Sequence, residues 1–390
     1  MPPTYRRYLA HVFLQWFTHS LFTTFGILLF YTLTNSILAA LLFFVIHYFS
    51  LVVVRSMGVS YFLRMVNAFG LKKIMLAGLG LSTLALGMLF YVQAGTLGLY
   101  IWLILIAVLK GVGETMYWTP SNTILFSFVG NTDQPGHYSA YGDMVRMLAG
   151  TLAALLGLGL HVQHLNFLTL FLIAAVLLMG SMIPLWKMEM PKTVRAVPFR
   201  QCLQELSPLA FLANIDVVSV LLTIGLPLII LFKFTSFSES VWVSAATAVA
   251  LILSSYVSAI FTDKKNTSLV IFSFALLLLT WSFYSVAASA LQIILLGISF
   301  GIFHQIISTR LEARLSREVV NAHAPIEATV SIEFARGLGL FIGASILLIA
   351  YLFTKSMPQS ILLLGILFLI PKGLYALGII PQRHSMPSNP

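Results

Sequence analysis

Lys110 and Glu114 are the two residues of this sequence whose types and spacing most clearly suit chemistry. Both stand inside a long apolar run, four positions apart, so in a helix they share one face and can form an ion pair. Taking two ions into such surroundings costs free energy, and ionisable residues kept at that cost are often functional. We expect the pair to bind a substrate or a proton, and a purely structural ion pair is the alternative.

Further polar side chains inside apolar runs extend this candidate site. His304 stands beside Gln305, and its imidazole suits proton exchange because it titrates near neutral pH, with a hydrogen-bonded packing residue as the alternative. Asp216 stands beside Asn214 near the start of another run, where a side chain reaching toward the membrane surface is the alternative. The candidate substrate-binding or proton-coupling residues are Gln15, His19, Lys110, Glu114, Tyr117, Trp118, Asn214, Asp216, His304 and Gln305.

The elements that must position these residues are long apolar helices. Apolar runs of about twenty residues, the length that crosses a bilayer core, recur roughly twelve times. Hydrophobic residues make up 59% of the chain and charged residues 9%, against about 25% charged in soluble domains. Only helices satisfy the backbone of such continuous runs in lipid, so we predict an all-α membrane protein. The predicted spans are 9–31, 36–54, 74–93, 98–127, 141–160, 166–186, 208–232, 240–261, 268–287, 290–309, 328–353 and 359–380.

The Lys and Arg residues predict the orientation of the chain. With the N-terminus inside, sixteen of the 22 fall on the inner side and two on the outer side, while the others lie within spans or at their ends. This asymmetry follows the positive-inside rule, so we expect both termini in the cytoplasm and a protein integral to the inner or plasma membrane. The net charge of +10 therefore reflects topology and does not indicate nucleic-acid binding.

The polar segment 187–207 predicts how the chain is divided. It is the longest polar interruption, it contains Pro191 and Pro198, and it separates six predicted spans from six. We therefore expect an N-terminal six-helix half over 1–186, a cytoplasmic linker over 187–207 and a C-terminal six-helix half over 208–390.

An internal repeat agrees with this division. A shift of 190 residues gives eight identities in the forty-two positions from Leu105 to Arg146, including Asn131 with Asn321 and Arg146 with Arg336. Because the repeat contains six spans, we predict two parallel halves related by an axis along the membrane normal.

Loop motifs in both halves resemble those of the major facilitator superfamily of secondary transporters, and the resemblance extends over nearly the full chain. The segment from Asn67 to Lys73 is similar to the family's Gly-x-x-x-Asp-Arg-x-Gly-Arg-Lys loop, with Asn67 in place of Asp and Ala68 in place of Arg. The segment from Thr262 to Lys265 keeps the acid and the lysines at the matching place in the second half. Simple positive-inside anchoring is the alternative for these lysines.

The resemblance implies that the cytoplasmic ends of spans five and eleven form gates with these loops. By this correspondence Asp263 meets Arg146, and Asn67 lies near Arg336 in a weaker contact, because Asn67 carries no charge. The family's antiporter signature, a glycine run with Gly-Pro in span five, is absent, which argues against drug/proton antiport. The gate candidates are Asn67, Gly70, Lys72, Lys73, Asp143, Arg146, Asp263, Lys264, Glu333 and Arg336.

These features together predict a secondary transporter that moves a small organic solute by alternating access, driven by protons. Its expected partners are the lipid bilayer, the solute and protons, and we expect a monomer without cofactor, metal or nucleic acid. Two alternatives stay open: a membrane-embedded enzyme of lipid modification, and a transport-inactive relative that acts as an interaction or sensor protein. The sequence does not identify the solute.

Overall fold

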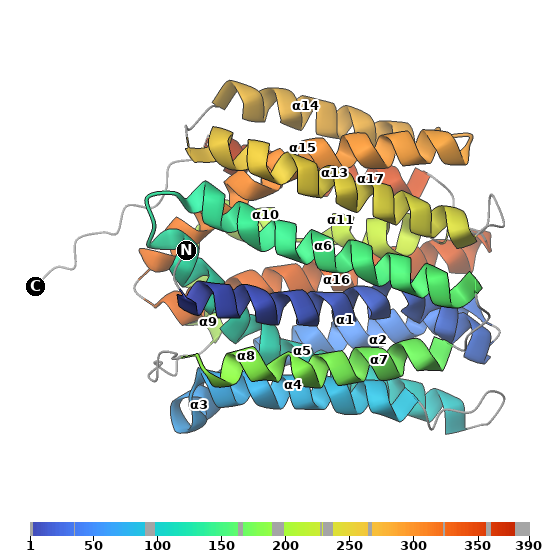
Figure 1. Ribbon diagram of the computed structural model, residues 1–390, viewed down its shortest axis with the longest axis horizontal. Helices are drawn as coiled ribbons and strands as arrows, with labels where there is room; N and C mark the ends of the chain where they lie inside the picture. Colours follow the sequence, from blue (N-terminus) through green and yellow to red (C-terminus); the bar gives the residue numbers. More distant parts are fainter. Residues whose placement is uncertain are drawn as a thin grey trace, which may run out of the picture.

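The computed structural model describes residues 3–34, 36–89, 98–162, 167–188, 199–226, 228, 237–263, 267–322, 324–355 and 360–378. Within these ranges every regular element is a helix, and the helices lie side by side as one bundle (Figure 1). This confirms the all-α prediction.

The long helices of the first half match the first six predicted spans. They are α1 (Pro3–Thr34), α2 (Ile37–Ser56), α4 (Leu71–Met88), α5 (Gly98–Gly130), α6 (Pro135–Val162) and α7 (Phe167–Gly180), which α8 (Met182–Trp186) continues. The second half contains α10 (Pro208–Ala213), α11 (Val217–Val220), the π-helical turn η2 (Leu221–Gly225), α13 (Phe237–Asp263), α14 (Thr267–Tyr284), α15 (Ala290–Val320), α16 (Pro325–Thr354) and α17 (Ser360–Leu377). The short helices α3 (Val59–Phe69) and α9 (Phe199–Gln204) join longer ones.

Length and composition make most of these helices suitable for a membrane. In the described part of the chain, eight helices are long and apolar enough to cross one, and residues 249–262 and 361–377 form shorter apolar helices. The remaining two predicted spans correspond to α1 and α6. These helices have 32 and 28 residues, so each is longer than a bilayer core is thick. Both carry polar side chains, such as Gln15 and Asp143, that are buried among other helices.

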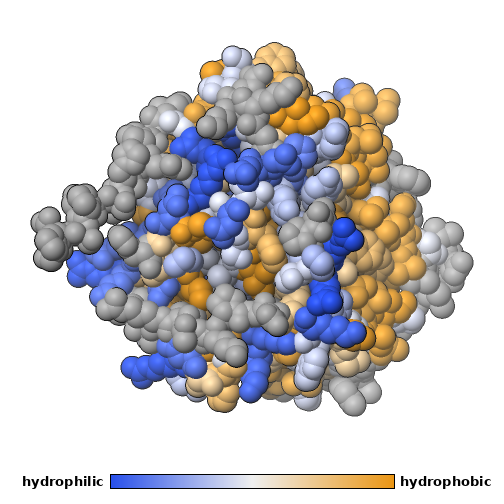
Figure 2. All heavy atoms as spheres, turned by 60° about the vertical axis from the view of Figure 1, so that its left-hand side comes forward, coloured by the Kyte–Doolittle hydropathy of each residue, from blue (hydrophilic) through white to orange (hydrophobic). Residues whose placement is uncertain are grey.

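One end of the bundle is polar and basic. We call it the basic end: α1 begins there, α5 and α15 end there, and both α3 and α9 lie there (Figure 1). Figure 2 shows hydrophilic side chains gathered over this end and hydrophobic ones over the flank. Its exposed cations include Arg6, Arg7, Arg64, Lys73, Lys187 and Arg200.

The structure corrects the sequence-based description of the segment from Asn67 to Lys73, which we expected to be a loop. Asn67 lies in the last turn of α3, and Lys72 and Lys73 lie in the first turn of α4. Gly70 joins the two helices with a φ of +82°, a conformation that side chains disfavour. The segment is therefore a helix–glycine–helix corner.

A second difference concerns the predicted continuous span at 208–232. The helix stops after Ala213, resumes at Val217 and then forms the π-helical turn. Gly339 of α16 packs on this break, where a Cβ atom would overlap the backbone of Ile215 and Asp216. The apolar pattern did not reveal the break because the flanking residues remain apolar.

The two halves meet along several helix pairs. The most extensive contacts between them join α6 to α13 and α2 to α16, and α5 also packs on α15. At the basic end the approach is close, because a Cβ at Gly130 of α5 would overlap Ser316 and Val320 of α15. α15 extends eleven residues beyond the predicted end of its span at 309, which brings Glu312 into this interface.

Candidate functional site

The middle of α5 carries a buried ion pair. Lys110 and Glu114 lie one turn apart, near the centre of the helix, and the Lys110 ammonium contacts the Glu114 carboxylate. Lys110 Nζ also lies 4.2 Å from the ring centroid of Phe22 on α1, a cation–π geometry. The side chains of Lys110 and Glu114 are 6% and 7% exposed, so solvent screens the pair little.

Two histidines from other helices approach the Glu114 carboxylate. His47 on α2 places Nε2 at 3.1 Å from Glu114 Oε2, and its Nδ1 lies 3.2 Å from the carbonyl oxygen of Ala107. His19 on α1 places Nδ1 at 3.6 Å from Glu114 Oε1, which is beyond hydrogen-bond distance. Three ionisable groups from three helices thus surround a single carboxylate.

The His47 contacts determine how many protons this cluster holds. A carbonyl oxygen only accepts hydrogen bonds, so His47 Nδ1 is assigned a proton and donates to Ala107. Neutral His47 would then offer only a lone pair at Nε2, and an ionised Glu114 also offers only lone pairs. The hydrogen bond between them therefore requires one additional proton, carried by either His47 or Glu114.

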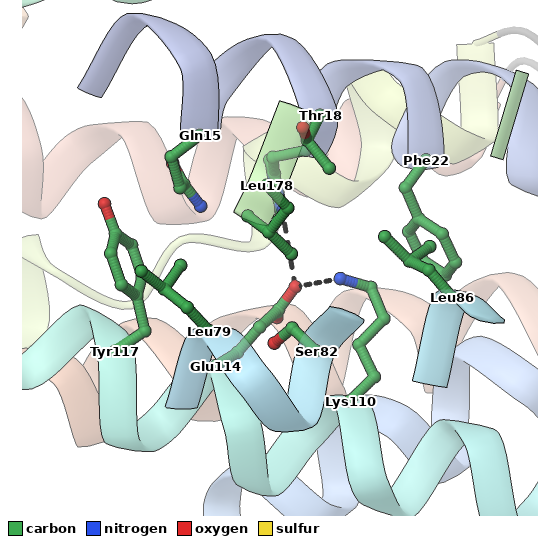
Figure 3. A pocket seen from close by; sticks show the side chains of 11 residues that line it. Gln15, Thr18, Phe22, Leu79, Ser82, Leu86, Lys110, Glu114, Tyr117 and Leu178 are labelled. Carbon is green, nitrogen blue, oxygen red and sulfur yellow. Dashed lines mark hydrogen bonds and ion pairs between the residues drawn. The ribbon is translucent and has the colours of Figure 1, made fainter. Parts of the chain in front are cut away.

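A small pocket adjoins this cluster between α1, α4, α5 and α7. Figure 3 shows the side chains of Lys110 and Glu114 reaching into it from α5, opposite Gln15 and Thr18 on α1. Two buried lining atoms, Gln15 Oε1 and His19 Nδ1, have no hydrogen-bond partner, and such atoms are costly unless a ligand or water completes them. The lining residues are Gln15, Thr18, His19, Phe22, Leu79, Ser82, Leu86, Lys110, Glu114, Tyr117 and Leu178.

The aromatic candidates flank the pocket. Tyr117 is fully buried, and its hydroxyl lies 2.8 Å from His11 Nε2. Trp118 makes edge contacts with Trp16 and His19, with ring centroids 5.5 Å and 5.8 Å apart. Tyr117 therefore helps to hold α1 against α5, while Trp118 packs beside His19.

The candidates of the second half form a separate cluster at the helix break. Asp216 Oδ1 accepts a hydrogen bond from Lys372 Nζ of α17 at 2.6 Å. Asp216 and Lys372 are also the charged groups that act on His304, whose ring stacks on Phe300 with centroids 5.0 Å apart. Asn214 donates to the carbonyl oxygen of Ala210 and so caps α10. The structure does not bring these residues into the pocket beside Glu114.

A polar network between α2, α5 and α16 joins the two halves near the basic end. Arg55 Nη2 lies 3.0 Å from Glu333 Oε2, and Asn122 Nδ2 donates to Glu333 Oε1 at 2.7 Å. Arg336 reaches the same Glu333 oxygen at 3.0 Å. We call Arg55, Asn122, Glu333 and Arg336 the first interface network.

A second interface network joins α6 to α15. Arg146 Nη1 lies 3.2 Å from Asp143 Oδ1 and 3.5 Å from Glu312 Oε1. Ser139 donates to Glu312 at 2.8 Å, and Gln305 donates to Asp143 at 2.8 Å. The Gln305 side chain therefore lies in the interface between α6 and α15. The side chain of the preceding residue, His304, belongs instead to the helix-break cluster.

The two networks are related by the 190-residue repeat. That shift takes Asp143 to Glu333 and Arg146 to Arg336, and it also takes Asn122 to Glu312. Each network thus pairs α5 or α15 of one half with the acid–arginine helix of the other half. The two networks differ in charge, because Asn122 is neutral where Glu312 is charged, and the first network also contains Arg55 of α2.

Parts of the expected gate remain predictions. Asp263 ends α13, but its side chain lies outside the described residues, as does the whole of Lys264. Among the described residues, the ion-pair partners of Arg146 are Asp143 and Glu312, and that of Arg336 is Glu333. Asn67 is exposed at the end of α3.

Sequence reasoning missed several residues of these clusters: Arg55, His47, Asn122, Glu312 and Lys372. His47 and Lys372 stand inside predicted spans, which was a usable signal. Glu312 stands where the repeat shift places Asn122. The sequence does not show which helix either residue faces, so it gave no reason to name them as site residues.

Comparisons with known proteins agree with this architecture. The chain is similar to the crystal structure of the human organic anion transporter MFSD10 (TETRAN), with a TM-score of 0.67 and 12% identity over 96% of this chain and 100% of that chain. It is also similar to a bacterial homologue of the iron transporter ferroportin in its outward-facing state, with a TM-score of 0.71 and 12% identity over 96% and 99%. The chain has the major-facilitator fold.

At this identity the likeness concerns the major-facilitator fold alone. No protein-family model matches the sequence, and no curated protein matches it. Within the fold, the Glu114 pocket lies inside the first half, the Asp216 cluster inside the second, and the interface networks between them.

Proposed function

We propose that this protein is a secondary transporter that moves a small organic solute by alternating access and couples the movement to protons at Glu114. The observation that carries the proposal is the 3.1 Å contact between His47 Nε2 and Glu114 Oε2, which needs an additional proton when His47 Nδ1 donates to Ala107. A proton held in a buried cluster of α1, α2 and α5 is bound or lost as those helices move, which is the property that coupling needs.

The interface networks support alternating access. Positive residues favour the cytoplasmic side, so the basic end is assigned to the cytoplasm together with the N-terminus. Both networks then close the halves on that side, where they hold the protein shut toward the cytoplasm. Opening requires the Arg55–Glu333 and Arg146–Glu312 contacts to separate, after which substrate in the bundle reaches the cytoplasm.

The similar structures favour transport over the enzyme alternative, since both are described as transporters. They differ in what they carry, an organic anion in one and iron in the family of the other. In the described part of this chain, no group of three or more His, Cys, Asp or Glu residues is arranged to hold a metal ion. The Lys110 ammonium on the pocket wall repels cations, so an organic solute suits the site better than a metal ion.

The test replaces Glu114 with Gln, which keeps the shape and hydrogen bonding of the side chain but cannot ionise. In proteoliposomes, Glu114→Gln should abolish accumulation of a labelled solute driven by a pH gradient, while exchange of that solute across the membrane continues. Glu205→Gln, at a partly exposed acid between α9 and α10, is the matched control and should accumulate solute like wild type.

Accumulation by Glu114→Gln at the wild-type level would contradict this assignment. Coupling would then have to involve Asp216 or His304, the titratable candidates of the helix-break cluster.

A further inference from the structure

The charge of the Glu114 pocket indicates which class of solute it accepts. This argument rests on the proposed function, because it uses the same additional proton. Lys110 carries one positive charge and Glu114 one negative charge, and they cancel when both histidines are neutral. The proton between His47 and Glu114 then leaves the cluster with a net charge of +1 inside the bundle.

Nothing else on the pocket wall compensates that charge. Glu114 is the one acid among the lining residues. The titratable groups facing it are His19 of α1, His47 and Tyr48 of α2, and Lys110 and Tyr117 of α5. The lining residues of α4 and α7 do not titrate: Leu79, Ser82, Leu86 and Leu178. Farther along α2, Arg55 is occupied by Glu333.

We infer that the pocket binds the carboxylate group of a small organic anion together with one proton. Whether the additional proton resides on His47 or on Glu114, these two residues together carry no net charge, so the Lys110 ammonium is uncompensated and available to the ligand carboxylate. If the anion bound without the proton, it would meet a Lys110 ammonium that Glu114 already neutralises. If the proton bound without the anion, the buried cluster would keep an uncompensated positive charge. Only joint binding restores neutrality, so proton and anion bind cooperatively.

The pocket walls fit this ligand. Figure 3 shows the Gln15 side chain directed into the pocket, where its amide nitrogen can donate a hydrogen bond to a carboxylate. His19 Nδ1 is buried without a hydrogen-bond partner and can donate in the same way when it carries the ring proton. Phe22, Leu79 and Leu86 supply apolar surface around the ion pair. The cavity is about 20 Å³, room for little more than one water molecule, so a ligand enters only when the surrounding helices move apart. A short monocarboxylate requires less of that movement than a large or multiply charged molecule.

The experiment measures ligand binding to the purified full-length protein by thermal-shift titration between pH 5 and pH 9. The probes are the sodium salts of acetate, pyruvate and benzoate, each beside its neutral methyl ester and equal NaCl. At least one carboxylate should bind, its ester should not, and the apparent Kd should rise about tenfold for each pH unit once the proton dissociates.

Variants separate the roles of the two residues. Glu114→Gln leaves Lys110 unpaired without a proton, so the carboxylate should still bind but with an apparent Kd that no longer changes with pH. Lys110→Met should weaken binding at least tenfold at every pH. The double variant, whose pocket is neutral and contains no unpaired ion, should fold and also fail to bind. Lys187→Met, at an exposed lysine beyond α8, is the matched control and should bind like wild type.

Binding of the esters equal to that of the salts, pH-independent carboxylate binding in wild type, or no binding of any probe would overturn the inference. Each of these results leaves the transport test of Glu114→Gln intact, so the proposed function is judged separately. Conversely, pH-linked carboxylate binding without any accumulation in proteoliposomes would support the site and contradict the transport proposal.

Discussion

Glu114 is a buried acid whose ionised form depends on its neighbours. Burying a carboxylate costs several kcal/mol, and Lys110 and His47 offset that cost through an ion pair and a hydrogen bond. Removal of either partner is expected to cost more than the pair contributes, because the remaining charge stays buried. The balance at this residue therefore sets both stability and proton affinity.

Lys110→Met tests this balance through stability. The change leaves Glu114 without its ammonium partner, so the free energy of unfolding should fall by up to about 3–5 kcal/mol. Thermal unfolding of the purified protein measures the loss as a lower Tm. The double variant Lys110→Met/Glu114→Gln removes both charges and should recover much of the lost Tm.

A double variant no more stable than Lys110→Met would show that Lys110 acts through its packing on Phe22 and not through the carboxylate. Lys187→Met serves as the reference, because an exposed lysine should change the Tm little.

At this site, only contacts between residues close together in the sequence could be predicted. Lys110 and Glu114 stand four residues apart, so helical geometry alone brings them together. His47 lies 67 positions from Glu114 and joins it only through the packing of α2 on α5. The sequence contains His47 but does not show that α2 packs on α5, so only the structure reveals that His47 and Glu114 lie close enough to share a proton.

At the scale of elements, the break between α10 and α11 has a clear packing partner. Gly339 of α16 lies against the backbone of Ile215 and Asp216, with no room for a side chain. The break exposes the Asp216 carboxylate to Lys372 of α17, which compensates it. Three helices thus depend on one glycine.

Gly339→Ala tests this packing. The added methyl group must displace the broken segment, so we expect a loss of about 1–3 kcal/mol in the free energy of unfolding and a weaker Asp216–Lys372 contact. Thermal unfolding measures the stability. Gly80→Ala is the matched control, because a Cβ at Gly80 of α4 has open space and should be tolerated.

Equal Tm values for Gly339→Ala and Gly80→Ala would contradict the close approach described here. A drop at Gly339 alone would support it.

The sequence predicted the helices well but not their interruptions. Apolar runs of spanning length mark a helix because lipid satisfies no backbone groups. The break between α10 and α11 cannot be located from the apolar pattern, because the residue that packs against it, Gly339, belongs to α16 and lies 125 positions after Asn214. The corner at Gly70 likewise depends on a single backbone conformation.

At the scale of the whole molecule, the two interface networks hold the halves together at one end. Arg146→Ala removes the cation that faces Asp143 and Glu312, leaving two buried acids together. We expect the variant to favour the state open to the cytoplasm. The readout is labelling of Ser316→Cys by a maleimide, because Ser316 is buried between α15 and α5 in this structure.

The background for this experiment is low. The native thiol, Cys202 of α9, is buried, and burial raises its pKa to about 12, which suppresses the reactive thiolate. Unchanged labelling in both Arg146→Ala and Asp263→Ala would contradict the gate. Arg55→Ala tests the first interface network in the same way.

Reporter fusions test the orientation of the whole chain. The sixteen-to-two distribution of Lys and Arg predicts that reporters placed after Arg200 and after Pro390 both register as cytoplasmic. A reporter just before Gly98, in the predicted outer loop, should register outside and is the control. An external signal at either of the first two points would refute the twelve-span topology.

The repeat predicts two halves, but it does not predict how residues of one half pair with residues of the other. The shift of 190 residues aligns Asp143 with Glu333 and Arg146 with Arg336 without showing that each pair contacts the opposite half. That information lies in the packing of α5 on α16 and of α6 on α15.

The Asp216–Lys372 contact also bears on how the protein is made. The acid lies in the break between α10 and α11, early in the second half, and the lysine lies in the last helix, 156 positions later. At about 5–20 residues per second, the ribosome needs roughly 8–30 s to reach the lysine after it has placed the acid. During that interval the acid lacks its permanent counter-ion, because Lys372 has not yet been made. The second half therefore reaches its final arrangement only when the last helix arrives, whereas the Lys110–Glu114 pair forms as soon as its own helix does.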